Sequence, residues 1–187
     1  MGYAIAESCA LHGAQVVIVS GPVQVTIQHP SVSIIQVQTA EEMYQETRKL
    51  FPSFDIGILA AAVADFTPDS QSPSKLKRGK GDLVLRLKPT HDIAAELGMK
   101  KSSKQLLIGF ALETDNEIDN AKNKLKRKNL DAIVLNSLND KGAGFGTDTN
   151  RISIIDKNNI IDNFELKTKG RVADDIVAKI IKMLAHD

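Results

Sequence analysis

Short runs rich in valine and isoleucine alternate along this chain with longer amphipathic stretches. The runs predict strands and the stretches predict helices, an alternation typical of β-α units around a parallel sheet. Strands are predicted over residues 15–20, 33–38, 55–64, 83–87, 106–112 and 131–135, and helices over residues 2–12, 39–51, 92–97, 117–128 and 172–184. The pattern therefore predicts an α/β fold, with a Rossmann-like, doubly wound and mostly parallel sheet covered by helices on both faces.

The run over residues 55–64 is the most apolar and is expected to form the central strand. Near the end of the chain, residues 151–155 and 160–166 flank an Asp-Lys-Asn-Asn turn and predict an antiparallel hairpin extension. The chain shows no internal repeat and no domain boundary, so residues 1–187 are expected to form a single domain.

The first predicted helix begins at Gly2 with no capping residue before it. A doubly wound sheet normally opens with a strand and a phosphate-binding turn that leads into the first helix. We therefore expect this domain to lack its first strand and the following loop, with Gly2 as the small residue that packs closely on that strand.

A nearly balanced charge narrows the classes of partner. Lys+Arg 24 against Asp+Glu 23 gives a formal net charge of +1, which provides no chain-wide attraction to nucleic acid or to an anionic membrane. Aromatic residues make up only 4% of the chain, which argues against base-stacking surfaces. The apolar runs are too short to span a bilayer, Cys9 has no partner for a disulfide, and no signal-peptide pattern opens the chain. We expect a cytoplasmic protein that binds neither nucleic acid nor membranes.

Polar groups follow three predicted strands, at Asp65, residues 110–115 and Asn136. Open parallel sheets bind ligands at the carboxyl ends of their strands. Residues 65–82 hold Pro, Ser, Gly and four basic residues, and a loop of that length is expected to be a functional lid or binding segment. A second basic segment places Lys124 and Lys128 four residues apart on one helix face, so that both can reach a polyphosphate.

Each of these features also has a plain structural explanation. Lysines near the end of a helix commonly only complement its dipole, and Asp65 suits a solvated turn. The four histidines lack the spacing of zinc ligands, and Cys9 on an apolar helix face is expected to be a small core residue. The Gly-Ala-Gly-Phe-Gly stretch at residues 142–146 precedes a strand and not a helix, so a connection or interface loop is expected there.

Seven stretches in register carry a family resemblance: MGYAIAE, VSGPV, AAAVADF, SKLKR, GFALET, KLKRKNLDAIVLN and GFGTDTN. Together they resemble the phosphopantothenate–cysteine ligase (phosphopantothenoylcysteine synthetase) family, the C-terminal domain of the bifunctional bacterial coenzyme A biosynthesis protein. The resemblance implies that CTP activates 4'-phosphopantothenate as an acyl-cytidylate, with loss of pyrophosphate, and that the amine of cysteine then displaces CMP. It also implies Mg2+ held through the nucleotide phosphates, with no metal ligands on the chain. FMN would belong only to an upstream decarboxylase domain, fused to or assembled with this one and absent here.

The resemblance also implies roles for individual residues. Lys75 matches the catalytic loop lysine and is a nucleotide contact as well. The other matched nucleotide-binding residues are Leu59, Ala60, Ala61, Asp65, His91, Asp92, Ile93, Ala94, Phe110, Lys124 and Lys128. His91 stands where the family usually has proline.

One departure concerns the start of the chain. The family's opening strand, its Gly-Pro-Thr turn and an Asn-containing loop have no counterpart before Met1, so the chain is expected to be inactive or impaired even if its parent is a ligase. The resemblance further implies a homodimer, which the edge strand of the terminal hairpin could form. Two alternatives remain: a nicotinamide-dependent oxidoreductase, although no G-x-G-x-x-G motif is present, and a non-catalytic nucleotide-binding fragment.

Overall fold

The main sheet of the protein has five strands. The computed structural model describes residues 1–70, 72, 74–78, 82–113, 115–137 and 148–185. In spatial order the strands are β10 (Ile161–Asn163), β9 (Ile152–Asp156), β7 (Ala132–Ser137), β6 (Leu106–Glu113) and β3 (Ile56–Leu59). β3, β6 and β7 run parallel, whereas β9 and β10 are antiparallel to their neighbours. The predicted α/β fold with a mostly parallel sheet and a terminal hairpin is therefore confirmed.

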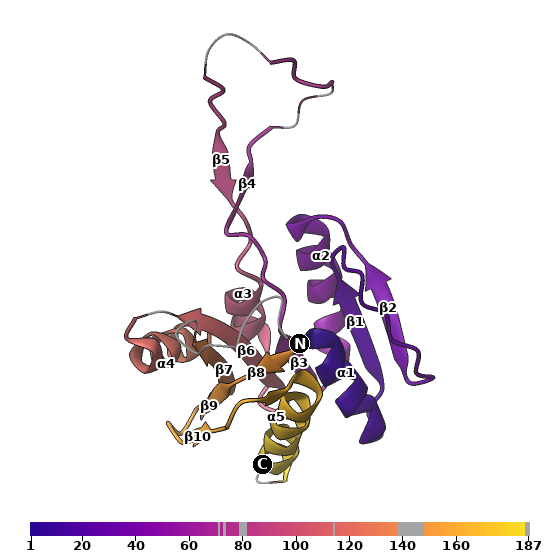
Figure 1. Cartoon of the computed structure of the whole chain (residues 1–187), viewed down its shortest axis with the longest axis vertical. Helices are drawn as coiled ribbons and strands as arrows, with labels where there is room; N and C mark the ends of the chain where they lie inside the picture. Colours follow the sequence, from indigo (N-terminus) through magenta and orange to yellow (C-terminus); the bar gives the residue numbers. More distant parts are fainter. Residues whose placement is uncertain (71, 73, 79–81, 114, 138–147, 186–187) are drawn as a thin grey trace.

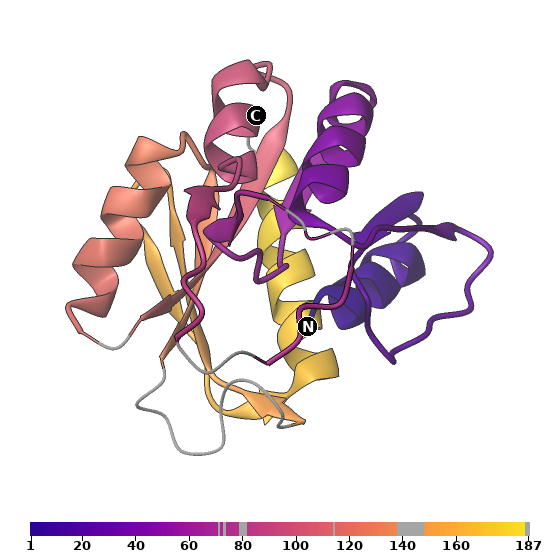
Figure 2. The same ribbon diagram turned by 90° about the horizontal axis from the view of Figure 1, so that it is seen from above.

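Helices cover both faces of this sheet. They are α1 (Gly2–Leu11), α2 (Ala40–Leu50), α3 (Ile93–Lys100), α4 (Glu117–Arg127) and α5 (Lys169–Leu184). Ile108 and Val134 belong to the core shared with α1 and α5, whereas their neighbours Leu107 and Ile133 belong to the core shared with α2, α3 and α4. Because successive strand residues point to opposite faces, a strand covered on both sides must be apolar throughout. In the view from above, α4 and α5 lie on opposite sides of the strands (Figure 2).

The helix starts follow their local sequence. The Thr39 hydroxyl accepts a hydrogen bond from Glu42 N at 3.1 Å, and the Glu42 carboxylate accepts one from Gln38 N at 2.7 Å, so α2 is capped from both directions. Asp92 caps α3 by accepting from Ala95 N at 3.1 Å. α1 has no side-chain cap and ends before Gly13, whose φ of +88° is the left-handed stop that its sequence predicts.

Two smaller parallel strands lie apart from the main sheet. β1 (Val16–Ser20) and β2 (Val32–Gln36) pair only with each other among the described residues, beside α1 and α2 (Figure 1). A short 3-10 helix, η1 (Phe51–Ser53), follows α2 and leads into β3. β8 (Thr149–Asn150) and β11 (Lys167–Thr168) form a short antiparallel pair before α5.

A two-stranded ribbon projects from the body of the molecule (Figure 1). It consists of β4 (Phe66–Pro68) and β5 (Leu87–Pro89), which pair in antiparallel register. The predicted strand at residues 83–87 is therefore shifted toward the C-terminus, and Leu83 to Leu85 are exposed beyond the paired residues. The reason is that the partner strand offers only three residues for pairing, so side-chain preference alone cannot extend the strand.

The expectation for the run at residues 55–64 is corrected. The strand predicted at residues 55–64 ends at Leu59 and forms an edge of the main sheet, because its hydrogen-bonded neighbour in the described chain is β6 alone. The central strands are β6 and β7, which are covered on both faces. A Cβ built on Gly2 would lie 3.6 Å from the Ala60 Cβ, an ordinary contact, and the expectation that Gly2 packs on a missing first strand stays a prediction.

Candidate anion-binding site at the strand ends

Two lysines of α4 are each held by a carboxylate from another element. Lys124 Nζ lies 2.5 Å from Glu113 Oε1, at the carboxyl end of β6. Lys128 Nζ lies 2.9 Å from Asp92 Oδ1, at the start of α3. Both lysines are only partly exposed, so the two positive charges are fixed in place and not spread over solvent-facing conformers.

Close packing of α3 on α4 fixes the position of Lys128. A Cβ added to Gly98 would lie 1.9 Å from Lys128 O, so only glycine allows this approach. Asn129 Nδ2 donates to Gly98 O at 2.7 Å, which joins the end of α4 to α3. The Lys128 side chain then extends along α3 to its first turn.

Asp92 has two structural tasks at this point. It caps α3 through Ala95 N and accepts a hydrogen bond from Lys128 Nζ. Burial alone would raise the pKa of Asp92, but the Lys128 hydrogen bond and the bond from Ala95 N outweigh burial and hold the pKa below its ordinary value. Asp92 is therefore a stable carboxylate that keeps one lysine at the helix start.

The residue before it, His91, stacks on an aromatic ring that the sequence did not single out. The His91 and Tyr44 rings lie 4.0 Å apart between centroids, at 10° to each other. Tyr44 Oη donates to Glu96 Oε2 at 2.7 Å, which lowers the pKa of Glu96 and raises the pKa of Tyr44. His91 thus anchors the root of the ribbon to α2, and no sequence spacing indicated that pairing.

The root of the ribbon brings Asp65 close to this segment. Thr90 N donates to Asp65 O at 2.9 Å, and Thr90 Oγ1 donates to Ala64 O at 2.7 Å. Leu59 and Ala60 are half-buried at the end of β3, next to Gly109 of β6, and Ala61 is exposed. The structure therefore brings three parts of the predicted site together at one edge of the sheet: the end of β3, Asp65 and the start of α3.

The other residues predicted to bind the nucleotide are not all brought to this edge of the sheet. Phe110 is half-buried within β6, and Ile93 and Ala94 form the first turn of α3, where Ile93 belongs to the core. Lys75 is exposed and lies between β4 and β5, in the segment that projects from the body (Figure 1). The structure does not bring Lys75 to the two lysines of α4.

An amide pair lies at the carboxyl end of the next strand. Asn150 Nδ2 donates to Asn136 Oδ1 at 3.1 Å, and Asn150 is 2% exposed. The sequence indicated Asn136 from its place after an apolar run, but Asn150 follows no such run and gave no signal. The Gly-Ala-Gly-Phe-Gly stretch predicted to be a connection lies outside the described residues.

Comparison with known proteins assigns the family. The family model described as "DNA/pantothenate metabolism flavoprotein C-terminal domain" matches residues 1–184. The chain belongs to this family. It is 58% identical over 98% of its length to a protein from an unknown prokaryotic organism named "Cysteine/Cysteine sulfinic acid decarboxylase", of which it covers 51%. It is 41% identical over 96% of its length to the Bacillus subtilis "Coenzyme A biosynthesis bifunctional protein CoaBC", of which it covers 44%.

Two solved structures agree with the fold. The crystal structure of the C-terminal domain of a CoaBC protein matches the whole chain with a TM-score of 0.82 at 38% identity, and 84% of that chain is covered. A DNA/pantothenate metabolism flavoprotein from Streptococcus pneumoniae has a TM-score of 0.81 at 23% identity, which shows the shared fold alone. The chain spans about half the length of the curated relatives that it matches.

The names of the matching family and of the relative at 58% identity contradict the expected assignment to the phosphopantothenate–cysteine ligases. The family is described as a flavoprotein family, and the relative at 58% identity is named for a decarboxylation, which is the reaction of a lyase. The expected CTP-dependent ligase activity is corrected accordingly, and neither the oxidoreductase nor the non-catalytic alternative is named by the matches. Coenzyme A biosynthesis is the printed role of the bifunctional relatives.

The match to a flavoprotein family also contradicts the expected cofactors. A flavoprotein family implies a flavin such as FMN, whereas the sequence led us to expect CTP with Mg2+ and to place FMN only in a separate domain. An isoalloxazine ring needs an enclosed, largely apolar slot, and ligand sites typically exceed about 300 Å3. A cavity beside the carboxyl end of β7, lined by Glu117, Arg151 and Phe164 among others, has about 200 Å3. The described residues at this edge therefore do not fit a flavin.

No group of three or more His, Cys, Asp or Glu side chains that could hold a metal ion occurs in the described part. No described helix is long and apolar enough to cross a membrane. Cys9 is half-buried against the core, and burial raises the pKa of its thiol, which disfavours the reactive thiolate.

Proposed function

We propose that this chain is a domain of a coenzyme A biosynthesis enzyme, and that it binds a phosphate-bearing, cysteine-derived substrate whose carboxylate the complete enzyme removes as CO2. The observation that carries the binding role is the fixed pair of cations, Lys124 and Lys128, one helical turn apart near the strand ends. The loss of CO2 is taken from the name of the relative at 58% identity. Because the chain spans about half of that relative, decarboxylation is proposed for the whole protein.

The chemistry explains why such a domain needs lysines. Decarboxylation breaks the bond between Cα and the carboxylate carbon, and the electron pair of that bond must be accepted by the remaining substrate or by a cofactor. Because the described residues at the strand ends do not fit a flavin, no electron acceptor is assigned to this chain. The lysines of this chain would hold the substrate's anionic groups and fix its orientation, since charge-assisted hydrogen bonds are stronger than neutral ones.

Glu113 and Asp92 prepare these lysines for a ligand. In the absence of an anion, each carboxylate neutralises one ammonium group at hydrogen-bond distance. An incoming phosphate offers more acceptor atoms than one carboxylate and can engage both lysines. We propose that Asp65, at the root of the ribbon, and Lys75, within the projecting segment, add contacts to the same ligand, together with the backbone of residues 59–61 and 91–94 and the ring of Phe110.

We also propose that the protein is a homodimer in the cytoplasm and that residues 1–187 act as one domain. Support for the dimer comes from β10, the antiparallel edge of the main sheet, whose outer hydrogen-bonding groups are unpaired with other described strands. Sedimentation equilibrium measures the mass directly, and a monomer at micromolar concentration would contradict the dimer.

The decisive experiment measures CO2 release by the complete protein. Cysteine, cysteine sulfinic acid and phosphopantothenoylcysteine, each labelled in the carboxylate, are compared as substrates. We expect the phosphate-bearing compound to be preferred, and the double variant Lys124→Ala/Lys128→Ala to raise its KM at least about tenfold, as expected for the loss of two charged contacts. Lys126→Ala, an exposed lysine of the same helix, is the matched control.

Three results would contradict the proposal. No CO2 from any of the three compounds would exclude decarboxylation, and so would release of pyrophosphate from CTP in the presence of phosphopantothenate and cysteine with no CO2 formed. An equal rise in KM for Lys126→Ala and for the double variant would remove the binding role from Lys124 and Lys128. Lys75→Gln, tested in the same assay, checks the proposed contact of the projecting segment.

A further inference from the structure

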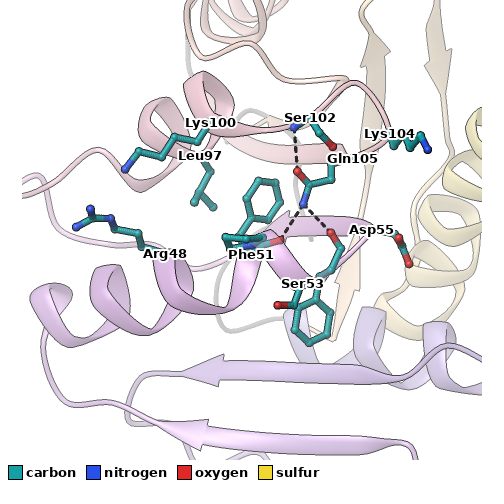
Figure 3. Close-up of a pocket in the computed structure, with 11 residues that line it drawn as sticks. Arg48, Phe51, Ser53, Asp55, Leu97, Lys100, Ser102, Lys104 and Gln105 are labelled. Atoms are coloured by element: carbon teal, nitrogen blue, oxygen red, sulfur yellow. Dashed lines mark hydrogen bonds between the residues drawn. The ribbon is translucent and has the colours of Figure 1, made fainter.

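A second cavity lies at the edge of the sheet where the parallel strands begin, opposite their carboxyl ends. It has a volume of about 450 Å3 and lies where the chain enters β3 and β6 (Figure 3). Its walls come from the end of α2, from η1, from the end of α3 and from the loop before β6. This cavity is separate from the lysine pair of α4 and has no part in the function proposed above.

The shape of the cavity is fixed by a side chain that bridges two loops. Gln105 Nε2 donates to Phe51 O at 2.8 Å and to Phe54 O at 2.7 Å, and Gln105 Oε1 accepts from Ser102 N at 2.9 Å (Figure 3). Both donor hydrogens of the amide are used, and so is its oxygen. The two loops are therefore held at a set distance in the absence of any ligand.

The middle of the cavity is apolar. The Phe51 ring and the Leu97 side chain lie side by side between the two ends of the cavity (Figure 3), and both residues are buried in the core. Pro52 adds a further apolar wall. Because Phe51 and Leu97 are only 6% and 2% exposed, the apolar surface covered on binding would be mainly that of the ligand's own hydrocarbon body, at about 25 cal/mol per Å2.

The charges around this apolar floor are mostly positive. Arg48 of α2, Lys100 of α3 and Lys104 of the following loop line the cavity, against one lining carboxylate, Asp55. Arg48 and Lys100 extend toward the same end, whereas Lys104 and Asp55 lie at the other (Figure 3). Lys100 Nζ is 3.7 Å from the half-buried carboxylate of Glu96, so a bound phosphate would have to compete with that carboxylate for Lys100.

Helix ends alone would not explain this arrangement. A cation in the last turn of one helix usually only complements that helix's dipole. Here two helices end at one cavity, each with a cation, and the third cation comes from a loop outside any helix. A guanidinium and an ammonium group at one end match a dianionic phosphate, because the guanidinium can bind two of its oxygens at once.

We infer that this cavity binds a phosphate monoester with a short apolar body, its phosphate between Arg48 and Lys100 and its carbon chain over Phe51 and Leu97. The volume falls within the range of about 300–1,000 Å3 that small-molecule sites occupy. The site requires no flavin, no metal and no contact with the lysines of α4.

Calorimetry with butyl phosphate tests the site on the full chain. The background variant Lys124→Ala/Lys128→Ala removes the strand-end lysines, so that binding reports on this cavity and stays separate from the proposed function. We expect one equivalent of butyl phosphate to bind, with a dissociation constant at least fivefold lower than that of inorganic phosphate. Arg48→Ala/Lys100→Ala on that background should raise the constant at least tenfold.

Two further variants make the outcome decisive. Lys49→Ala removes a neighbouring exposed lysine that pairs with Glu46 at 3.7 Å outside the cavity, and it should leave binding unchanged. Ser53→Asp adds a negative charge at an exposed lining position and should abolish binding without disturbing the core. Equal binding of butyl phosphate by the Ser53→Asp variant, or an equal loss for Lys49→Ala and for Arg48→Ala/Lys100→Ala, would overturn the inference. Absence of any binding on the background variant would overturn it as well.

Discussion

The imidazole of His91 lies flat on the ring of Tyr44 and also lies between two carboxylates, Glu41 at 3.5 Å and Glu96 at 3.3 Å. Three separate parts of the chain meet there: α2, the start of α3 and the root of the projecting ribbon. A single side chain thus joins the candidate site to the helix beside it.

Removing this stack should lower stability by a small, measurable amount. We expect His91→Ala to reduce the free energy of unfolding by about 1 kcal/mol, because an aromatic pair contributes roughly 0.5–1.5 kcal/mol beyond its buried area. His91→Phe keeps the stack and loses the contacts with the carboxylates, so most of that stability should remain. Urea unfolding measures both variants. Equal losses for the two would show that stacking is not the stabilising contact.

Glycine at position 98 should be irreplaceable. A Cβ there would meet a backbone oxygen of Lys128 at 1.9 Å, and a backbone atom cannot move aside cheaply. We expect Gly98→Ala to cost at least about 3 kcal/mol and to lower Tm by roughly 6–12 °C. Gly170→Ala is the matched control, since nothing lies within 4 Å of its added Cβ and alanine is the better helix former. Calorimetric melting of both variants tests the contrast, and a similar Tm for the two would contradict it.

Removing the buried carboxylate of Asp131 should lower the free energy of unfolding more than removing Lys157, its ion-pair partner at the surface. It accepts from Lys101 Nζ at 2.5 Å and from Leu107 N at 2.8 Å. Asp131→Ala would leave both donors without that acceptor, with Lys101 largely buried, and should cost about 3–5 kcal/mol. Lys157→Ala, which removes a half-exposed lysine 3.7 Å from the same carboxylate, should cost less than about 1 kcal/mol. If chemical denaturation gave equal costs for the two, burial would not be the deciding factor.

Acid should weaken the turn between β9 and β10. Burial alone would raise the pKa of Asp156, but hydrogen bonds from Lys179 and from the backbone of Ile160 and Asn158 outweigh burial and hold the pKa below its ordinary value of 3.8. A carboxyl with a lowered folded-state pKa contributes its stability above 3.8 and loses it as pH falls through the folded pKa, because the unfolded chain then binds more protons. We therefore expect the free energy of unfolding to decline from about pH 5 downward.

The variant Asp156→Asn isolates this contribution. Its free energy of unfolding should be lower than that of the wild type at pH 7 and should depend less on pH below about 5. Lys179, whose folded-state pKa is raised by the same pair, should show the opposite sign, with stability lost only at strongly alkaline pH. Parallel pH dependences for Asp156→Asn and the wild type between pH 3 and 5 would rule out this carboxyl as the source.

Local elements of the fold follow from the sequence, and non-local partners do not. Thr39 and Glu42 predicted the start of α2, because a capping box needs only residues three apart. The run that contains β3 was expected to be central because it is apolar, yet hydropathy does not specify how many strands lie beside it. The ribbon was missed as a paired element, since Phe66 and Pro89 are far apart in sequence.

In the candidate site too, local features could be predicted from the sequence and non-local partners could not. Lys124 and Lys128 were predicted to lie on one helix face; the structure places Lys124 in α4 and Lys128 directly after its last residue, and their carboxylate partners come from β6 and from the start of α3. The cavity beside η1 gave no sequence signal at all. Arg48 and Lys100 lie in the last turns of α2 and α3, far apart in sequence, and only the fold brings them to one side of Phe51.

The projecting ribbon also determines what remains folded after proteolytic cleavage of the chain. A protease that reached the exposed segment between β4 and β5 would leave β3 in one fragment and β6 in the other. These two strands remain hydrogen-bonded in parallel from Ile56 with Leu106 to Leu59 with Gly109, and the cores on both faces of the sheet draw residues from both fragments. A nicked protein should therefore stay associated as a non-covalent pair of fragments, and the same site should accept a new N- and C-terminus in a circularly permuted chain.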